Sequence, residues 1–221
     1  MNEHSVGKLC GKTFILGGLL TFIPFLLQII LGGTPQEGVH IFTDFANNVV
    51  AGGKVSLLYA LSSAVGISLL AYSNFTLNGL LQKKKQHAIM GLGTFLFVLS
   101  QIGLMVAWAM DIGIIFGAER IDIGNWFIIE MSLFFIFAPI SFVGAALISY
   151  GLLYHQFINT TLLKTSVGLF GLIAIIFCYT LLTLKDHSAA TITPLFISIS
   201  IGQCVAIAWN VLVGKKMIDT M

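Results

Sequence analysis

Charged residues are scarce in this 221-residue chain: lysine, arginine, aspartate and glutamate together make up only 9% of it. A soluble domain carries roughly 25% charged residues, because its surface must stay hydrated. So small a share cannot cover a water-facing surface, and most of the exterior must therefore face lipid. The mean hydropathy of +0.97 agrees with this conclusion. The formal net charge of +2 is too small to indicate a nucleic-acid partner.

Cysteines are also few, and catalytic motifs are missing. Cys10, Cys178 and Cys204 are odd in number and show no CxxC or Cys/His spacing, so neither a disulfide framework nor a zinc site is expected. The sequence has no HExxH, no GxSxG and no phosphate-binding glycine loop. It therefore predicts no catalytic residue and no metal site, and it leaves any cofactor unknown.

Long apolar runs are what the sequence has in place of charge. About 20 mostly apolar residues in a helix cross the hydrocarbon of a bilayer, and continuous runs exclude a barrel, whose strands would alternate. The sequence therefore predicts an all-α fold, a polytopic transmembrane bundle of six helices that forms one domain over residues 1–221. The predicted spans are residues 14–31, 55–77, 88–110, 127–152, 162–184 and 192–213.

Basic residues are sorted between the loops in a way that predicts an orientation. Cytoplasmic loops of membrane proteins carry an excess of lysine and arginine. If both termini are cytoplasmic, the inner side carries Lys8, Lys12, Lys83, Lys84, Lys85, Lys164, Lys215 and Lys216. The outer side then keeps only Lys54, Arg120 and Lys185. We therefore expect a multi-pass protein of the cell membrane, with cytoplasmic termini and the lipid bilayer as its first partner.

Two outer loops are long enough to have structure of their own. Residues 32–54 are too many for a tight turn, and the segment from His40 to Val50 is partly amphipathic. This pattern favours a short helix lying along the membrane interface. Residues 111–125 form the second predicted outer loop.

Small and polar residues recur at helical spacing within every predicted span. Examples are Gly17, Gly93, the pair Glu130 and Gly144, and the pair Gly171 and Cys178. One interpretation is that these stripes join the helices, because helix association in lipid relies on close packing and polar contacts. The other is that they line a polar central cavity. Its candidate lining is then Gln28, Gln203 and Asn210, since unpartnered amides facing lipid would be costly.

Glu130 stands out as a single carboxylate inside the apolar run NWFIIEMSLFF. Its predicted depth is about 6 Å below the outer interface. In a structural hypothesis it pairs with Arg120 or caps amides of the outer loop. In a functional hypothesis it binds a cation, a proton or a substrate amine together with Asp111 or Asp44. The functional hypothesis predicts that Glu130→Gln lowers thermal stability only modestly.

His40 completes the candidate cluster of Glu130, Asp111, Arg120 and Asp44. It precedes Asp44 by four residues, a spacing that would allow a metal to bind if the segment is helical. The simpler interpretation of such a pair is a solvated face of a surface helix.

Two stretches carry a resemblance to a known family. They are GGKVSLLYALSSAVGISLLAYSNFTLNGLLQ and VGAALISYGLLYHQFINTTLLKTSVGLFGLIA. Together they resemble a family of bacterial polytopic membrane proteins with six or seven helices, known only as a domain of unknown function. The family commonly has a proline in the loop before the last of these helices, whereas residues 160–164 contain none. The resemblance implies a fold and a bacterial-type membrane, and it supplies no catalytic residues.

Three functions are compatible with these features. The leading hypothesis is a non-catalytic binding or accessory component of a membrane assembly, with other membrane subunits as partners. The alternative is a small cation- or proton-coupled transporter or channel with an acidic outer mouth, which requires a polar path from Glu130 to Gln203 and Asn210. The third is a membrane enzyme acting on a lipid or quinone. It requires two or more of His40, Asp44, Asp111 and Glu130 to meet at one cavity.

Overall fold

The computed structural model describes residues 3–31, 40–184 and 189–220, and these ranges form seven α-helices. They are α1 (Glu3–Leu31), α2 (Ile41–Gly52), α3 (Lys54–Lys84), α4 (Ala88–Gly117), α5 (Ile123–Tyr154), α6 (Thr160–Leu182) and α7 (Ala189–Thr220). All except α2 are long and apolar enough to cross a membrane. The predicted all-α fold with six spanning helices is therefore confirmed.

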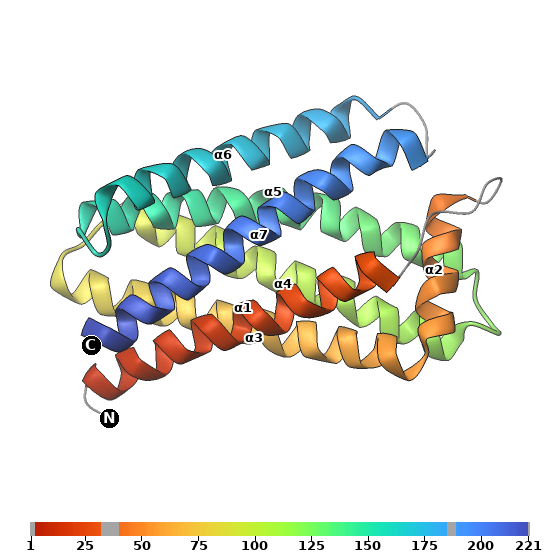
Figure 1. Ribbon diagram of the computed structural model, residues 1–221, viewed down its shortest axis with the longest axis horizontal. Coiled ribbons are helices and arrows are strands. Elements are labelled where there is room, and N and C mark those ends of the chain that lie inside the picture. The colour runs from red at the N-terminus through yellow and green to blue at the C-terminus, as the bar shows by residue number, and fades with distance from the viewer. Residues whose placement is uncertain (1–2, 32–39, 185–188, 221) are drawn as a thin grey trace.

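The six long helices run lengthwise through the molecule (Figure 1), and their contacts form a closed ring. Going round it, α1 packs on α3, α3 on α4, α4 on α5, α5 on α6, α6 on α7, and α7 returns to α1. Short connections after Lys84 and Tyr154 make the helices that they join antiparallel neighbours. Because the number of spans is even, the two termini lie at the same end of the ring (Figure 1).

Pairs of glycines hold three of these helix contacts close. They are Gly11 with Gly214 between α1 and α7, Gly17 with Gly66 between α1 and α3, and Gly93 with Gly144 between α4 and α5. A Cβ atom added to Gly214 would lie 2.6 Å from the carbonyl oxygen of Gly11. Such backbone contact is the kind of packing that joins helices where lipid competes for apolar side chains. Three of the six contacts that close the ring thus depend on the absence of a side chain.

Helix α6 does not follow the predicted packing stripe. A Cβ atom at Gly171 would meet no atom within 4 Å, and Cys178 is exposed. The stripe predicted for this helix is therefore wrong. The contact with the bundle is made by bulky residues instead, namely Leu163, Phe170, Ile173, Ala174 and Phe177. Glycine and cysteine are left on the side that faces away from it.

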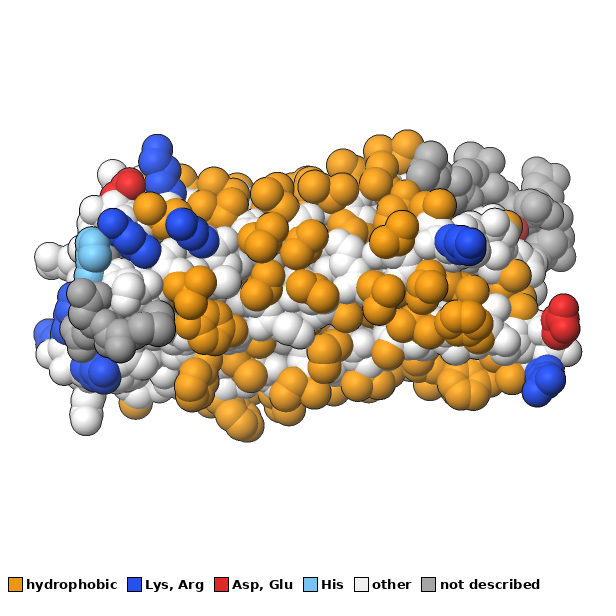
Figure 2. Space-filling view, turned by 90° about the horizontal axis from the view of Figure 1, so that it is seen from below, with side chains coloured by type: hydrophobic (Ala, Val, Ile, Leu, Met, Phe, Trp, Pro, Cys, Tyr) orange, Lys and Arg blue, Asp and Glu red, His pale blue; other side chains and the backbone are white. Residues whose placement is uncertain are grey.

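Apolar side chains cover the middle of the molecule, and lysine and arginine lie toward its two ends (Figure 2). Large hydrophobic side chains are widely exposed there, among them Phe75 at 68%, Ile175 at 68% and Phe116 at 75%. So much exposed apolar surface on every spanning helix is stable only in lipid. The chain is an integral, multi-pass membrane protein.

The lysine-rich loops meet at one end of the ring. The start of α1, the end of α3, the start of α6 and the end of α7 all lie beside the termini (Figure 1). We call this end the lysine end, defined by Lys8, Lys12, Lys83, Lys84, Lys85, Lys164, Lys215 and Lys216. Lys54 and Arg120 lie at the opposite end, which we call the α2 end.

Helix α2 crosses the α2 end of the ring (Figure 1). It packs against α3, α4 and α5, and its buried apolar face consists of Ile41, Phe42, Ala46 and Val49. Gly53 alone separates α2 from α3, and its φ of 50° lets the chain turn there without steric strain. The short helix expected from the amphipathic segment is therefore present.

Candidate functional site

A cavity of about 740 Å³ lies inside the ring. All seven helices contribute to its lining. The contribution of α4 is a regular series at intervals of four and three residues, which places the side chains on one helix face: Phe97, Gln101, Leu104, Trp108 and Asp111. The volume of the cavity falls within the range of small-molecule binding sites, roughly 300–1,000 Å³.

Aromatic side chains close the cavity toward the lysine end. The Trp209 ring meets Phe14 and Phe170 edge-on, with ring centroids 5.9 and 6.2 Å apart, and Phe170 stacks on Phe142 at 6.3 Å. Between these rings and the lysine end lies a layer of fully buried side chains, which includes Leu77, Met90, Leu152 and Met217. We call the rings the aromatic floor and the layer beneath them the core layer.

The apolar face of α2 covers the opposite end of the cavity. Ile41, Phe45 and Val49 belong to the lining. Phe45 also packs edge-on against Phe196 of α7 at 5.3 Å, and its ring is tilted against that of Phe127 of α5 at 6.0 Å. The short helix therefore connects two sides of the ring across its α2 end.

Two carboxyl groups face each other in the cavity wall near the α2 end. Asp111 of α4 and Glu130 of α5 are 1% and 2% exposed, and their carboxyl groups are close neighbours. The Gln28 amide of α1 donates to Asp111 Oδ2 over 3.5 Å. Asp111 Oδ1 and Glu130 Oε2 are buried and have no hydrogen-bond partner in the described part of the chain.

This arrangement is costly unless something neutralises it. Two ionised carboxylates at such close range repel one another, and a buried charge without a partner loses its hydration. The pair therefore requires a shared proton or a bound cation. We call Asp111 and Glu130 the acid pair.

The acid pair lies well inside the ends of its two helices. Asp111 is six residues before the end of α4 and Glu130 is seven residues after the start of α5, which places both about 10 Å inside the helix ends. The prediction ended the third span at the charge of Asp111. The helix continues because the residues after it, from Ile112 to Phe116, are apolar apart from one glycine.

Arg120 does not join the acid pair. It is exposed in the turn after α4, where its backbone N–H donates to the Gly117 carbonyl over 2.7 Å. Within the described ranges, no ion pair links its guanidinium to Glu130, and Glu130 Oε2 stays unpartnered. The Arg120–Glu130 pair of the structural hypothesis is therefore not formed. The extension of α4 explains this, since it carries Arg120 two and a half turns beyond Asp111.

His40 and Asp44 also lie outside the cavity lining. His40 is exposed at the N-terminal end of α2, whereas Asp44 is 3% exposed, so the interpretation of a solvated helix face fails for Asp44. Its burial follows from the packing of α2 against α5, which leaves little of this helix in water. Over the described residues, no three His, Cys, Asp or Glu side chains gather closely enough to hold a metal.

The structure places all three predicted amides, Gln28, Gln203 and Asn210, in the cavity lining. Gln101 is a further polar residue of the lining that was not predicted, and it donates to the Ser141 hydroxyl over 3.1 Å. The spacing of Gln101 and Asp111, which puts them on one face of α4, was the feature of the sequence that could have predicted Gln101 as a lining residue. The Trp209 indole N–H at the floor has no partner among the described residues.

Comparison with known proteins adds no relative: no family model, no curated protein and no solved structure matches this chain. The fold and the site alone define its class. It is an integral membrane bundle of six spanning helices with an internal cavity that contains a buried acid pair.

Proposed function

We propose that this protein is a non-catalytic binding component of the membrane, whose cavity holds a small amphipathic molecule with a cationic amine. The acid pair carries the proposal, because two buried carboxyl groups each have an oxygen without a hydrogen-bond partner in the described part of the chain. Intramembrane acids of this kind are costly to keep and commonly mark ligand or ion sites. By the positive-inside rule, the lysine end faces the cytoplasm and the α2 end faces outward.

An ammonium group matches the acid pair better than a neutral group does. It supplies positive charge and three hydrogen-bond donors, which can satisfy Asp111 Oδ1 and Glu130 Oε2 together. The rest of the lining is mostly aromatic and aliphatic, so the body of the ligand is apolar.

Transport of a cation coupled to protons is the second candidate. One observation favours it: Glu130, Gln203 and Asn210 line the same cavity. The aromatic floor and the core layer would have to open for passage toward the lysine end, which makes binding the better-supported function. Accumulation of a membrane-impermeant quaternary amine in proteoliposomes under a proton gradient would favour transport. The requirement stated for a membrane enzyme is met by Asp111 and Glu130, which line one cavity. The described lining contains no His, Cys or Lys beside them, so binding is the better-supported function.

Three amphiphiles of equal chain length test the proposed binding. We expect decylamine to raise the melting temperature of the purified protein by about 5 °C at a concentration near 100 times its Kd. Decanol and decanoate, which lack the positive charge, should raise it far less. The double variant Asp111→Asn/Glu130→Gln should lose the decylamine shift. Equal shifts with all three amphiphiles, or an unchanged shift in the double variant, would contradict the proposal.

A further inference from the structure

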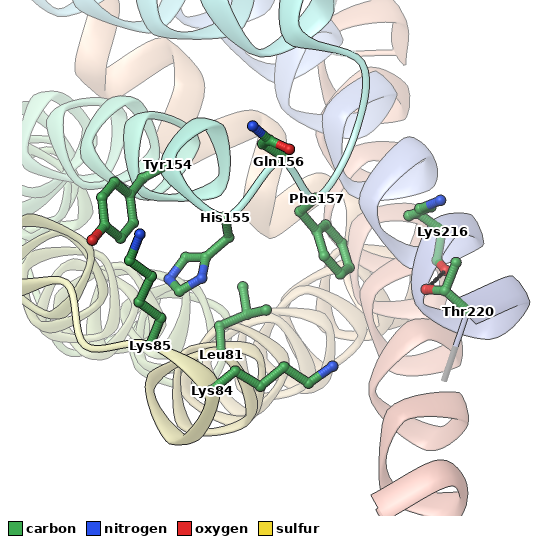
Figure 3. A pocket seen from close by; sticks show the side chains of 9 residues that line it. All are labelled: Leu81, Lys84, Lys85, Tyr154, His155, Gln156, Phe157, Lys216 and Thr220. Carbon is green, nitrogen blue, oxygen red and sulfur yellow. Dashed lines mark hydrogen bonds between the residues drawn. The ribbon is translucent and has the colours of Figure 1, made fainter.

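A second pocket, of about 580 Å³, lies at the lysine end (Figure 3). It shares no lining residue with the cavity inside the ring, and the core layer lies between the two. Its lining comprises Leu81, Lys84, Lys85, Tyr154, His155, Gln156, Phe157, Lys216 and Thr220. We call it the basic pocket.

Three separate parts of the chain build the basic pocket. Helix α3 ends at Lys84, and Lys85 caps it, while the last turns of α7 contribute Lys216 and Thr220 (Figure 3). The third part is the turn after α5. There Gln156 has a φ of 50°, a conformation more usual for glycine, and the Phe157 N–H donates back to the Leu152 carbonyl over 3.1 Å.

Positive charge is concentrated on this pocket. Lys84, Lys85 and Lys216 bring three ammonium groups to it, and none of the described lining residues carries a carboxylate. The Lys85 Nζ lies 4.0 Å from the centre of the Tyr154 ring, which orients it by a cation–π contact. Figure 3 shows the Lys84 and Lys85 side chains extending in different directions from the end of α3, so the positive charge is spread around the lining. An anion bound in the pocket would be stabilised by this charge.

His155 adds a hydrogen-bonding group to the same pocket. Its Nε2 atom is buried and has no partner among the described residues. Partial burial is the main cause that lowers the pKa of His155, and the neighbouring His87 and Lys85 lower it further. The ring is therefore neutral at pH 7 in the empty protein, and an anion in the pocket would favour its protonated form.

We propose that the basic pocket binds a phosphate-type anion, carried by a lipid headgroup or by a soluble phosphate. Lysine ammonium groups are common phosphate ligands, and basic pockets between membrane helices bind anionic headgroups. Leu81 and Phe157 give the pocket an apolar wall, which suits the glycerol and upper acyl chain of a phospholipid. The lipid is therefore the source that the lining favours.

Lipid binding to the full chain in detergent, followed by native mass spectrometry, tests the inference. Phosphatidylglycerol should bind more tightly than phosphatidylcholine. The triple variant Lys84→Gln/Lys85→Gln/Lys216→Gln should lose about tenfold or more of this affinity. The matched control is Lys12→Gln/Lys164→Gln/Lys215→Gln, which removes the same charge from exposed positions at the same end but outside the pocket. Equal losses in the two triple variants would overturn the proposal.

Inorganic phosphate separates the two sources. Displacement of phosphatidylglycerol by millimolar phosphate supports a site for the phosphate group itself, open to soluble ligands. Tight lipid binding that phosphate does not displace supports a site for the lipid. The proposal is overturned if phosphatidylglycerol binds no better than phosphatidylcholine and inorganic phosphate does not bind. An unchanged melting temperature in both triple variants shows that the comparison is made on folded protein.

The same assay has a pH readout that a nonspecific basic surface would not give. Phosphatidylglycerol does not titrate near neutrality, so a change in its affinity reports the protein. The charged and titratable groups around His155 are Lys84, Lys85, His87 and Tyr154. Protonation of His155 adds positive charge, so affinity should rise about threefold from pH 8 to pH 5.5. His155→Gln should flatten this dependence, and an unchanged dependence in that variant would contradict the assignment.

Discussion

Glu130→Gln is expected to lower the affinity for decylamine by about 100-fold while raising the melting temperature of the ligand-free protein. The loss of affinity corresponds to about 2.7 kcal/mol, which is the magnitude of a hydrogen bond to a charged group in a site with little water. The amide of the variant keeps the shape of the side chain but not its charge. Titration of decylamine against wild type and variant measures the change directly.

The gain in stability follows from the partner of Glu130. Its carboxyl group meets that of Asp111 and not the guanidinium of Arg120. A glutamine at this position removes the repulsion and donates a hydrogen bond to Asp111. We expect a gain of about 2 kcal/mol, or roughly 5 °C. The functional hypothesis from the sequence predicted a modest loss of thermal stability instead, because the contact between Glu130 and Asp111 was not yet known.

Glu119→Gln is the matched control, since Glu119 is an exposed acid at the same end of the ring and outside the cavity lining. It should change neither the melting temperature nor the affinity for the amine. A large loss of stability in Glu130→Gln, of the 3–5 kcal/mol that breaking a buried ion pair costs, would show that Glu130 has a cationic partner in the protein. Undiminished amine binding in Glu130→Gln would show that the acid pair is not part of the amine-binding site.

Gly214→Ala is expected to destabilise the protein by about 2 kcal/mol or more, because it separates α1 from α7 where the ring closes. The new Cβ atom would lie 2.6 Å from the Gly11 carbonyl oxygen, and that atom belongs to a helix backbone that cannot move alone. The reciprocal variant Gly11→Ala should have a similar effect, since its Cβ would lie 2.5 Å from the Gly214 carbonyl oxygen. Thermal unfolding in detergent measures both.

Gly171→Ala gives the contrast. It lies within α6 with no atom near its added Cβ, so the helix-stabilising effect of alanine should appear alone, at about 0.5–1 kcal/mol. The two classes of glycine are therefore predicted to respond with opposite signs. Tolerance of alanine at both Gly11 and Gly214 would mean that α1 and α7 do not meet closely, and that the ring is open.

The parts of this structure that depend on one segment at a time could be predicted from the sequence. Span number follows from the length of each apolar run, and α2 follows from the amphipathic pattern of its own residues. The environment of Glu130 could not be predicted in the same way. It depends on how α1, α4 and α5 converge, and on the continuation of α4 past Asp111, where a charge was taken to end the helix.

The basic pocket shows the same limit. Each lysine is visible in the sequence, and their common side of the membrane was expected. Which of them line the pocket depends on the turn after α5. There Gln156 has a positive φ, which its residue type does not predict. Lys84, Lys85 and Lys216 line the pocket, whereas Lys12, Lys164 and Lys215 lie outside its lining. Only the three-dimensional arrangement separates the two sets.

Quenching of tryptophan fluorescence by 10-bromodecylamine tests the cavity with its acid pair most directly. Trp108 and Trp209 line the cavity, whereas Trp126 is 41% exposed outside the lining and can be removed as Trp126→Phe. In that background we predict saturable quenching of the two remaining tryptophans, abolished by Asp111→Asn/Glu130→Gln. Quenching that rises linearly with the amine and is the same in the double variant would contradict the account.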